Sequence, residues 1–268
     1  MPATSTAATR LREGRKAKVE FIDKRRREFL RVAAGGTALL ALMASPLAAL
    51  AQMTGAAPVK IGTLGAGRIG GTLGRLWVKA GHPVMFSSRH PEQLKGMVDE
   101  LGPLARAGTP ADAVAFADVV LLAVPYGAMP QVAKDFGRDL ATKALVLDAT
   151  NPFESRDGKV GARARKKGVG VAAAELLPGV RLVRAFNAIG YARMAEAGKR
   201  PAGERYGMPM AGDDAKALEL ASKLVREIGY EPVVIGPMKT MGNHLLPGTP
   251  LAGERSPDEI RKILATLK

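Results

Sequence analysis

Three glycines at a fixed spacing form the clearest chemical motif in the chain. They belong to the stretch GAGRIG, residues 65–70, which has the pattern G-x-G-x-x-G. In this pattern the first glycine permits a tight turn, the second lets backbone N–H groups approach a pyrophosphate, and the third lets a helix pack closely on a strand. The positive end of that helix would face the phosphates. The motif therefore predicts a dinucleotide site with contacts from Gly65, Gly67, Arg68, Ile69 and Gly70.

The elements on either side of the motif decide whether it binds a ligand. Residues 59–64 have the pattern of a short buried strand, and residues 83–88 that of a second one. Between them, apolar residues recur at i, i+4, i+7, i+8 and i+11, as on one face of a helix: Ile69, Leu73, Leu76, Trp77 and Ala80. A glycine motif between a strand and an amphipathic helix is the context of a nucleotide site. We therefore favour this interpretation over a glycine-rich turn with no ligand.

The end of the second strand indicates which dinucleotide the site takes. NAD sites usually place Asp or Glu there, about 20 residues after the motif, to bind the ribose hydroxyls. This chain has Ser87, Ser88 and Arg89 instead, with no acidic residue before Glu92. Hydroxyls and a guanidinium suit a 2′-phosphate, which a carboxylate would repel. The sequence therefore predicts NADP (as NADPH) as the cofactor, and the alternative is a solvated loop.

The composition excludes several other kinds of site. The 268 residues include no cysteine, so disulfides, thiol nucleophiles and cysteine-ligated metals are excluded. The histidines at 82, 90 and 244 lack metal-ligand spacing, so no metal site is predicted, and His82 is expected to be structural. The formal net charge is +15, of which +6 falls in residues 1–51. Since no nucleic-acid-binding motif accompanies this charge, no nucleic acid is expected as a partner.

Residues 1–51 have the features of an export signal. The stretch RRREFLR, residues 25–31, resembles the twin-arginine motif, and the apolar run after it ends in ALA at 49–51. A charged region, an apolar region and small residues at a cleavage site are the three parts of a secretory signal. We predict export by the twin-arginine machinery, cleavage between Ala51 and Gln52, and a periplasmic mature protein. The alternatives are a buried helix, an uncleaved membrane anchor and a basic arm.

The remaining strands are predicted from continuous apolar runs. Residues 117–125 and 143–152 are typical of parallel strands that are buried on both faces. Further strands are predicted at 181–189 and 231–238. Residues 205–212 also have the pattern of a strand, which Pro209 should confine to a sheet edge because proline lacks a backbone N–H.

The helices between these strands complete the predicted fold. One is expected at 126–139 and another at 214–228, the second with Asp213 as its cap and Gly229 as its stop. Alternation of strands and helices indicates an α/β fold with a doubly wound, mostly parallel Rossmann sheet. We predict an NADP-binding Rossmann domain at 52–240 and a small C-terminal extension at 241–268.

Ligands in such sheets lie outside the carboxyl ends of the strands. Polar and turn residues at three predicted strand ends are therefore site candidates. For cofactor contacts these are Val124, Pro125 and Asn151, and for an acceptor pocket they are Tyr126, Asn187 and Ile189.

No constellation of acid, base and nucleophile accompanies the predicted strand ends, and no catalytic residue is assigned. Hydride transfer between two planar rings depends on orientation, because the cofactor carries the reaction. An NADP(H)-dependent oxidoreductase fits this pattern. A non-catalytic NADP-binding sensor fits it too. A reductase of imine or carbonyl substrates would need a general acid, such as Tyr126 or Tyr191.

Residues 60 to 238 resemble the F420-dependent NADP oxidoreductase family. The resemblance rests on IGTLGAGRIG, SSR, LLAVPYGA, DATNP, AFNAIG and AGDD, in this order. It implies a Rossmann fold, a homodimer, and hydride exchange between NADP(H) and a flavin or the deazaflavin coenzyme F420. It also implies that NADP(H) is held by Gly65, Gly67, Ile69, Ser88 and Arg89.

Three features depart from the family pattern or lie outside it. Ala66 and Arg68 stand where archaeal members have Thr and Asn, and the C-terminal NHLLPGTPLAGERSPDEI does not resemble their deazaflavin-binding end. Residues 155–168 carry six Lys or Arg and one Asp. Such a tract is usually a solvated loop; the alternative is a clamp on an anionic acceptor.

Overall fold

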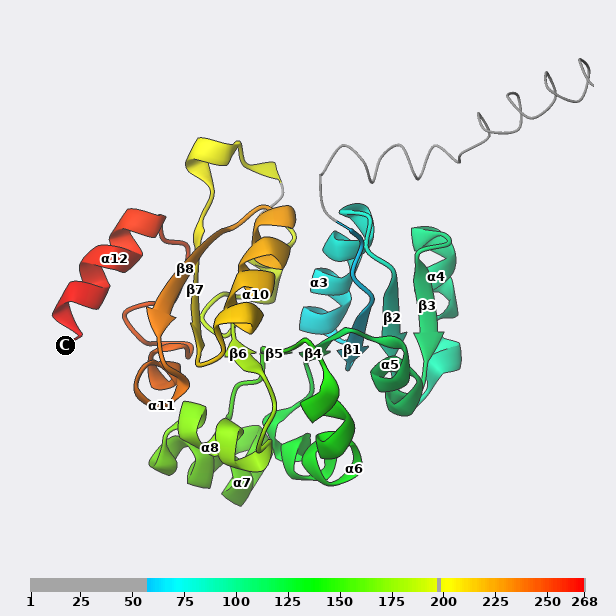
Figure 1. Cartoon of the computed structure of the whole chain (residues 1–268), viewed down its shortest axis with the longest axis horizontal. Coiled ribbons are helices and arrows are strands. Elements are labelled where there is room, and N and C mark those ends of the chain that lie inside the picture. Colours follow the sequence, from blue (N-terminus) through cyan, green and yellow to red (C-terminus); the bar gives the residue numbers. More distant parts are fainter. Residues whose placement is uncertain (1–56, 197–198, 268) are drawn as a thin grey trace, which may run out of the picture. The chain divides into compact units, whose positions relative to one another are not determined.

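The computed structural model describes residues 57–196 and 199–267 (Figure 1). The predicted export signal and its cleavage site lie outside the described residues. Within the part that is described, no helix is long and apolar enough to cross a membrane.

The described chain is built on one eight-stranded sheet. Its strand order is β3-β2-β1-β4-β5-β6-β7-β8, and every neighbouring pair is parallel except β6 and β7. The predicted α/β, doubly wound and mostly parallel fold is therefore confirmed. The strands are β1 Ile61–Leu64, β2 Val84–Ser87, β3 Ala105–Gly108, β4 Val119–Leu122, β5 Leu145–Asp148, β6 Leu182–Arg184, β7 Gly207–Gly212 and β8 Glu231–Gly236.

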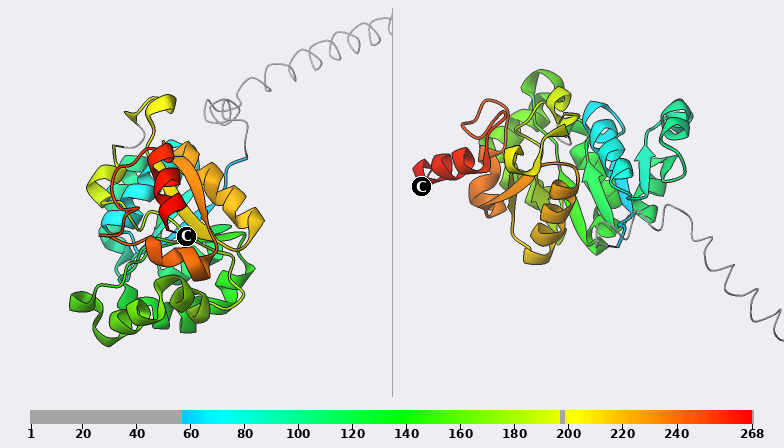
Figure 2. Two further views of the ribbon diagram at one scale, coloured as in Figure 1. Left: turned by 90° about the vertical axis from the view of Figure 1, so that its left-hand side faces the viewer. Right: turned by 90° about the horizontal axis from the view of Figure 1, so that it is seen from above.

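Helices cover both faces of the sheet (Figure 2). Buried side chains of α3 and α10 form the core on one face, called the first core, and those of α5, α6, α8 and α12 form the core on the other face, called the second core. The helices are α3 Arg68–Lys79, α4 Lys95–Leu101, α5 Pro110–Phe116, α6 Met129–Thr142, α7 Glu154–Lys167, α8 Val169–Leu176, α9 Tyr191–Met194, α10 Ala215–Glu227, α11 Met238–Met241 and α12 Pro257–Thr266. Single turns of 3-10 helix occur at Pro91–Leu94, Tyr126–Ala128, Ala202–Glu204 and Gly242–His244.

The strand and helix around the glycine motif form as predicted. Leu73 and Trp77 are fully buried on the inner face of α3, and the helix ends just before Gly81, whose φ is +95°. The indole N–H of Trp77 donates a hydrogen bond to the carbonyl oxygen of Leu224 at 3.0 Å, which ties α3 to α10. The position of α3 on the sheet is therefore set by packing and by one long-range hydrogen bond.

His82 is structural, as predicted. The backbone N–H of Val59 donates to its Nδ1 at 3.0 Å, and its Nε2 lies 2.8 Å from Glu227 Oε2. Because Nδ1 accepts, the proton is on Nε2, which donates to the carboxylate.

The prediction that Pro209 places β7 at a sheet edge is wrong, because β7 lies between β6 and β8. The three-residue strand β6 pairs only with Ala211 and Gly212. Pro209 therefore has no strand beside it on the β6 side, and its missing N–H interrupts no ladder there. Within the described residues the edge strands are β3 and β8.

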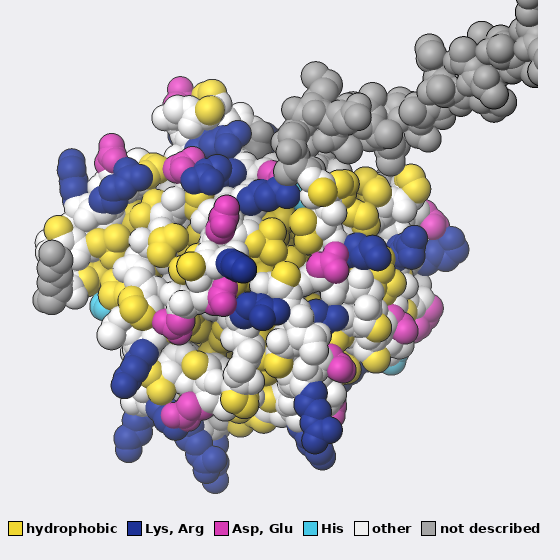
Figure 3. Space-filling model, viewed as in Figure 1, with side chains coloured by type: hydrophobic (Ala, Val, Ile, Leu, Met, Phe, Trp, Pro, Cys, Tyr) yellow, Lys and Arg dark blue, Asp and Glu magenta, His cyan; other side chains and the backbone are white. Residues whose placement is uncertain are grey.

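Two further predictions are corrected by the structure. The cap of α10 is Asp214, whose carboxylate accepts from the N–H of Ala217 at 2.8 Å, while Asp213 accepts from the N–H of Met238 at 3.1 Å. The tract at 155–168 is helical rather than a loop, since it lies almost wholly in α7. Buried Asp157 anchors this helix, and the Lys and Arg side chains over α7 and α8 project into solvent along the lower edge of the molecule (Figure 3).

Residues after 240 pack onto the sheet. Ile260 of α12 is fully buried in the second core, and Ser256 and Glu259 form a capping box at the start of that helix. The N–H of Gly207 also donates to the carbonyl oxygen of Arg255 at 2.8 Å. The predicted extension is thus joined to β7 by both apolar and polar contacts.

Candidate functional site

A cleft of about 950 Å³ lies at the carboxyl ends of β1, β2 and β4. Its volume is within the range of small-molecule and cofactor sites. The cleft brings together seven of the predicted site residues: Gly65, Gly67, Ser87, Ser88, Arg89, Val124 and Pro125. Strand ends that are far apart in the sequence therefore form one concave surface.

The three glycines of the motif differ in what a side chain would meet at each position. Gly65 has φ +95°, and a Cβ there would come within 2.8 Å of the carbonyl oxygen of Ala123. A Cβ on Gly70 would overlap the carbonyl oxygen of Gly65, so only glycine lets α3 start so close to β1. A Cβ on Gly67 would meet nothing within 4 Å. Gly67 therefore faces open space on the ligand side of the turn, while Gly65 and Gly70 are required by the protein itself.

The N-terminus of α3 lies directly behind this turn. Gly67 is its N-cap, no side chain caps it, and its first turn carries no acidic residue. Its first N–H groups therefore remain available to an anion, which the helix dipole also favours. Arg68 is the first helical residue, and its guanidinium lies 5.0 Å from the ring centroid of Tyr191, so its charge stays at this end of the helix.

The two serines after β2 have different roles. Ser87 is fully buried, donates to the carbonyl oxygen of Thr63 at 2.7 Å and accepts from the N–H of Gly65 at 3.4 Å, so it supports the glycine turn. Ser88 is half-buried and accepts from the N–H of His90 at 3.0 Å, which leaves its own O–H free to donate. Arg89 is exposed and forms no ion pair with any described residue. The acidic residue that lines the cleft, Asp135, comes from α6 rather than from the end of β2.

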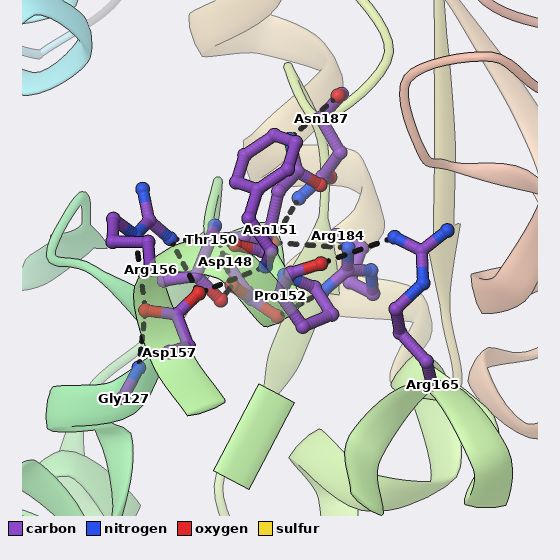
Figure 4. Close-up of polar contacts among 11 residues, drawn as sticks. Gly127, Asp148, Thr150, Asn151, Pro152, Arg156, Asp157, Arg165, Arg184 and Asn187 are labelled. Atoms are coloured by element: carbon purple, nitrogen blue, oxygen red, sulfur yellow. Dashed lines mark hydrogen bonds and ion pairs between the residues drawn. The ribbon is translucent and has the colours of Figure 1, made fainter. Parts of the chain in front are cut away.

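Asn151 and Asn187 lie together at the ends of β5 and β6 (Figure 4). The side-chain Nδ2 of Asn151 donates to the carbonyl oxygen of Asn187 at 2.8 Å, and Nδ2 of Asn187 donates to the carbonyl oxygen of Thr150 at 3.0 Å. The cleft of 950 Å³ is not lined by either residue. Ile189, two residues further on, packs against the first core. The structure therefore pairs two predicted residues in a second place beside the cleft.

Tyr126 does not line the cleft. It begins the 3-10 turn Tyr126–Ala128, which directs its ring into the second core with only 1% of the residue exposed. There it lines a separate cavity of about 290 Å³ between α6, α7 and α8. Burial raises the pKa of its hydroxyl to about 12. The predicted acceptor pocket of Tyr126, Asn187 and Ile189 therefore stays a prediction.

These elements match known proteins as follows. Residues 60–152 match the family model of coenzyme F420-dependent NADP oxidoreductases. That segment contains the glycine turn, Ser88, Arg89 and Asn151. The match supports a nicotinamide-dependent oxidoreductase. No curated protein shows significant similarity to the chain.

Solved structures share the fold over most of the described chain. A hypothetical protein from Sinorhizobium meliloti is 26% identical, over 73% of this chain and 93% of that one, with a TM-score of 0.59. A protein from Arthrobacter sp. FB24 assigned as an F420-dependent NADP reductase is 22% identical, over 69% and 87%, with a TM-score of 0.56. An imine reductase from Pseudomonas sp. is 12% identical, over 78% and 62%, with a TM-score of 0.51. The Arthrobacter protein and the imine reductase show only that this chain has the same fold as they do.

Replacing Tyr126 with Phe should stabilise the protein slightly. The hydroxyl is buried and has no hydrogen-bond partner within the described residues, so its removal should raise the free energy of unfolding by about 1 kcal/mol. Urea denaturation measures this change, and Tyr191→Phe, at a residue that is 42% exposed, is the control that should leave stability unchanged. A loss of more than about 1 kcal/mol would show that the hydroxyl has a partner after all.

A buried ion pair beneath the asparagines escaped the sequence analysis. Arg184 Nη1 and Asp148 Oδ2 are 2.5 Å apart, and both side chains are fully buried (Figure 4). Arg184 Nη2 also donates to the carbonyl oxygens of Thr150 at 3.1 Å and Leu245 at 3.2 Å. A charged residue within an apolar run was the available signal, because such a residue must find a partner when the strand is buried.

Asp157 holds the loop between β4 and α6. Its Oδ1 accepts from the N–H of Gly127 at 2.9 Å, its Oδ2 accepts from the N–H of Phe153 at 2.8 Å, and Arg156 donates to both oxygens. Pro125, two residues before Gly127, lines the cleft. The carboxylate of Asp157 therefore holds the backbone next to this part of the cleft wall.

Proposed function

We propose that the protein is an NADP(H)-dependent oxidoreductase that transfers a hydride between NADPH and a flavin or deazaflavin acceptor. One observation carries the preference for NADP. The end of β2 places the hydroxyl of Ser88 and the guanidinium of Arg89 on the wall of the cleft, and among the described residues Arg89 has no ion-pair partner and no carboxylate follows β2 beside them. A 2′-phosphate is the group that these donors suit, since Arg binds phosphate oxygens through several N–H groups at once.

The residues of the cleft fit the whole dinucleotide. The uncapped N–H groups at the start of α3 would hold the pyrophosphate, with the open side of Gly67 giving it room. Ser88 and Arg89 would hold the 2′-phosphate of the adenosine half. When bound, NADPH supplies the hydride. The chain's own residues therefore act by binding and orienting the two reactants and by excluding water from the place where they meet.

The acceptor is proposed from the family match and from two exposed aromatic residues. Phe153 follows β5 with 38% of its surface exposed, and Tyr191 begins α9 with 42% exposed. Each ring has a guanidinium within about 5 Å, from Arg156 at 5.1 Å and from Arg68 at 5.0 Å. Rings with adjacent cations suit a planar, anionic partner, and a phosphorylated flavin or coenzyme F420 has both properties.

Wild-type protein should bind NADPH at least about tenfold more tightly than NADH, because Arg89 gains its partner only from the 2′-phosphate. Arg89→Asp should remove that preference. Quenching of Trp77 fluorescence by the reduced nicotinamide gives both dissociation constants. Arg138→Asp is the matched control, since it makes the same charge change at an exposed site outside the cleft. Equal affinities in the wild type, or a preference that survives in Arg89→Asp, would contradict the assignment of NADP.

The acceptor is tested separately by NADPH oxidation. Riboflavin, FMN, FAD and coenzyme F420 are each supplied with NADPH, and absorbance at the nicotinamide band is followed. We expect turnover with at least one of them. If NADPH binds but no acceptor is reduced, the non-catalytic sensor becomes the better function. Export by the twin-arginine machinery to the periplasm and assembly as a homodimer stay predictions.

A further inference from the structure

The asparagines at the ends of β5 and β6 each present a side-chain oxygen without a partner. Oδ1 of Asn151 and Oδ1 of Asn187 are both buried, and neither is hydrogen-bonded within residues 57–196 and 199–267. The orientation of both amides is determined by their other atom, because each Nδ2 donates to a main-chain carbonyl oxygen, which can only accept. Both oxygens are therefore hydrogen-bond acceptors that need N–H or O–H donors.

The backbone holds Asn187 in place at a conformational cost. The preceding residue, Phe186, is the single described non-glycine residue with a positive φ, +68°. Its ring is held edge-on between Trp77 and Tyr230, with centroid distances of 6.2 and 6.0 Å. Bulky residues rarely adopt this conformation, and such strain persists where the surrounding structure enforces it, often at ligand sites. Asn187 is therefore positioned by the core and not by chance.

The strand order places these oxygens at the nicotinamide end of the proposed cofactor. The 2′-phosphate donors follow β2 and the pyrophosphate turn follows β1, so the second half of a dinucleotide runs onward over β4 toward β5 and β6. Neighbouring strands are about 4.8 Å apart, so each step along this order moves the ligand by about one ring width. Asn151 and Asn187 occupy the two strand ends that come next.

We propose that Oδ1 of Asn151 and Oδ1 of Asn187 accept the two N–H bonds of the nicotinamide carboxamide and so orient the ring for hydride transfer. This inference rests on the proposed binding of NADP(H). A primary amide offers two N–H donors on one nitrogen, and the protein offers two unpartnered acceptors on two asparagines that are joined by a hydrogen bond. Both residues are positioning residues, since the reacting carbon is on the ring.

The test uses changes in the ligand, so that the protein stays intact. Calorimetry on the wild type compares NADP⁺, its 3-acetylpyridine analogue, its nicotinic acid analogue and 2′,5′-ADP. The acetyl group has no N–H, so its analogue should bind about tenfold or more weakly than NADP⁺. The nicotinic acid analogue should bind more weakly still, because it places a carboxylate against two acceptors. The fragment 2′,5′-ADP lacks the nicotinamide and reports the adenosine half alone.

A variant assigns the effect to the asparagine. In Asn187→Leu, NADP⁺ should lose about tenfold in affinity, its advantage over the 3-acetylpyridine analogue should shrink because only the Asn151 oxygen is left to accept an N–H, and 2′,5′-ADP should bind as before. Equal binding of NADP⁺ and the acetylpyridine analogue to the wild type would overturn the inference while leaving NADP binding intact. Absence of NADP⁺ binding would overturn the proposed function as well. If Asn187→Leu does not fold, the comparison of ligands on the wild type decides alone.

Discussion

Replacing Arg184 with Met should lower the free energy of unfolding by about 3–5 kcal/mol, because the carboxylate of Asp148 is then buried without a countercharge. Guanidinium denaturation followed by Trp77 fluorescence measures the change. The matched control is Arg75→Met, which breaks a surface ion pair between Arg75 and Glu100. Exposed pairs of this kind contribute about 0–1 kcal/mol, so the control should stay close to the wild type.

A double variant separates the charge from the loss of packing. Asp148→Asn combined with Arg184→Met removes both charges, and it should be more stable than Arg184→Met alone because no buried ion is left unpaired. If the single and double variants are equally destabilised, the cost comes from the lost contacts with Thr150 and Leu245 instead. A single variant within about 1 kcal/mol of the wild type would show that the pair is accessible to water.

The second large effect should come from two alanine substitutions in the glycine motif. Gly70→Ala places a methyl group on the carbonyl oxygen of Gly65, so the turn and helix must move apart, at a cost of about 1–3 kcal/mol. Gly67→Ala meets nothing within 4 Å and should leave stability nearly unchanged. NADPH binding should nonetheless weaken at least about tenfold in Gly67→Ala, since the methyl group takes the place where the pyrophosphate approaches the backbone.

The pair of variants is informative because stability and binding should change independently. Thermal denaturation and fluorescence titration are measured on both proteins, with Gly137→Ala in α6 as a control at a position where a Cβ is also unobstructed. Full NADPH affinity in Gly67→Ala would mean that the phosphates do not lie against this turn. Wild-type stability in Gly70→Ala would mean that the contact between the start of α3 and Gly65 is looser than described.

The parts of the site that could be predicted are those whose reason is local. A turn that needs Gly65 at positive φ, a strand that ends at Ser87, and an apolar helix face all leave their pattern within a few neighbouring residues. The same is true of Asn151, which closes a continuous apolar run. The sequence therefore predicted that these residues follow strands of the sheet. The fold class was predicted from the alternation of strands and helices.

The parts that could not be predicted depend on contacts between distant segments. The direction of the Tyr126 ring is decided by a single turn of 3-10 helix and by the space beneath α6, neither of which alters the local pattern. The interior position of Pro209 depends on how short β6 is. The helix at α7 is held by Asp157, whose partners include Gly127, 30 residues away. For Pro209 and for α7 the deciding residues are too distant in the sequence for a periodicity pattern to include them.

The hydrogen bond from Arg184 to the carbonyl oxygen of Leu245 links the centre of the sheet to a residue 61 positions later in the chain. During synthesis, β5 and β6 leave the ribosome well before that carbonyl does. Until it arrives, a guanidinium in the middle of the sheet has one fewer acceptor, and the strand ends that carry the two asparagines lack their final support. The nucleotide half of the sheet can therefore assemble on the nascent chain before residue 245 is made, whereas the half that would face the acceptor is completed only after it.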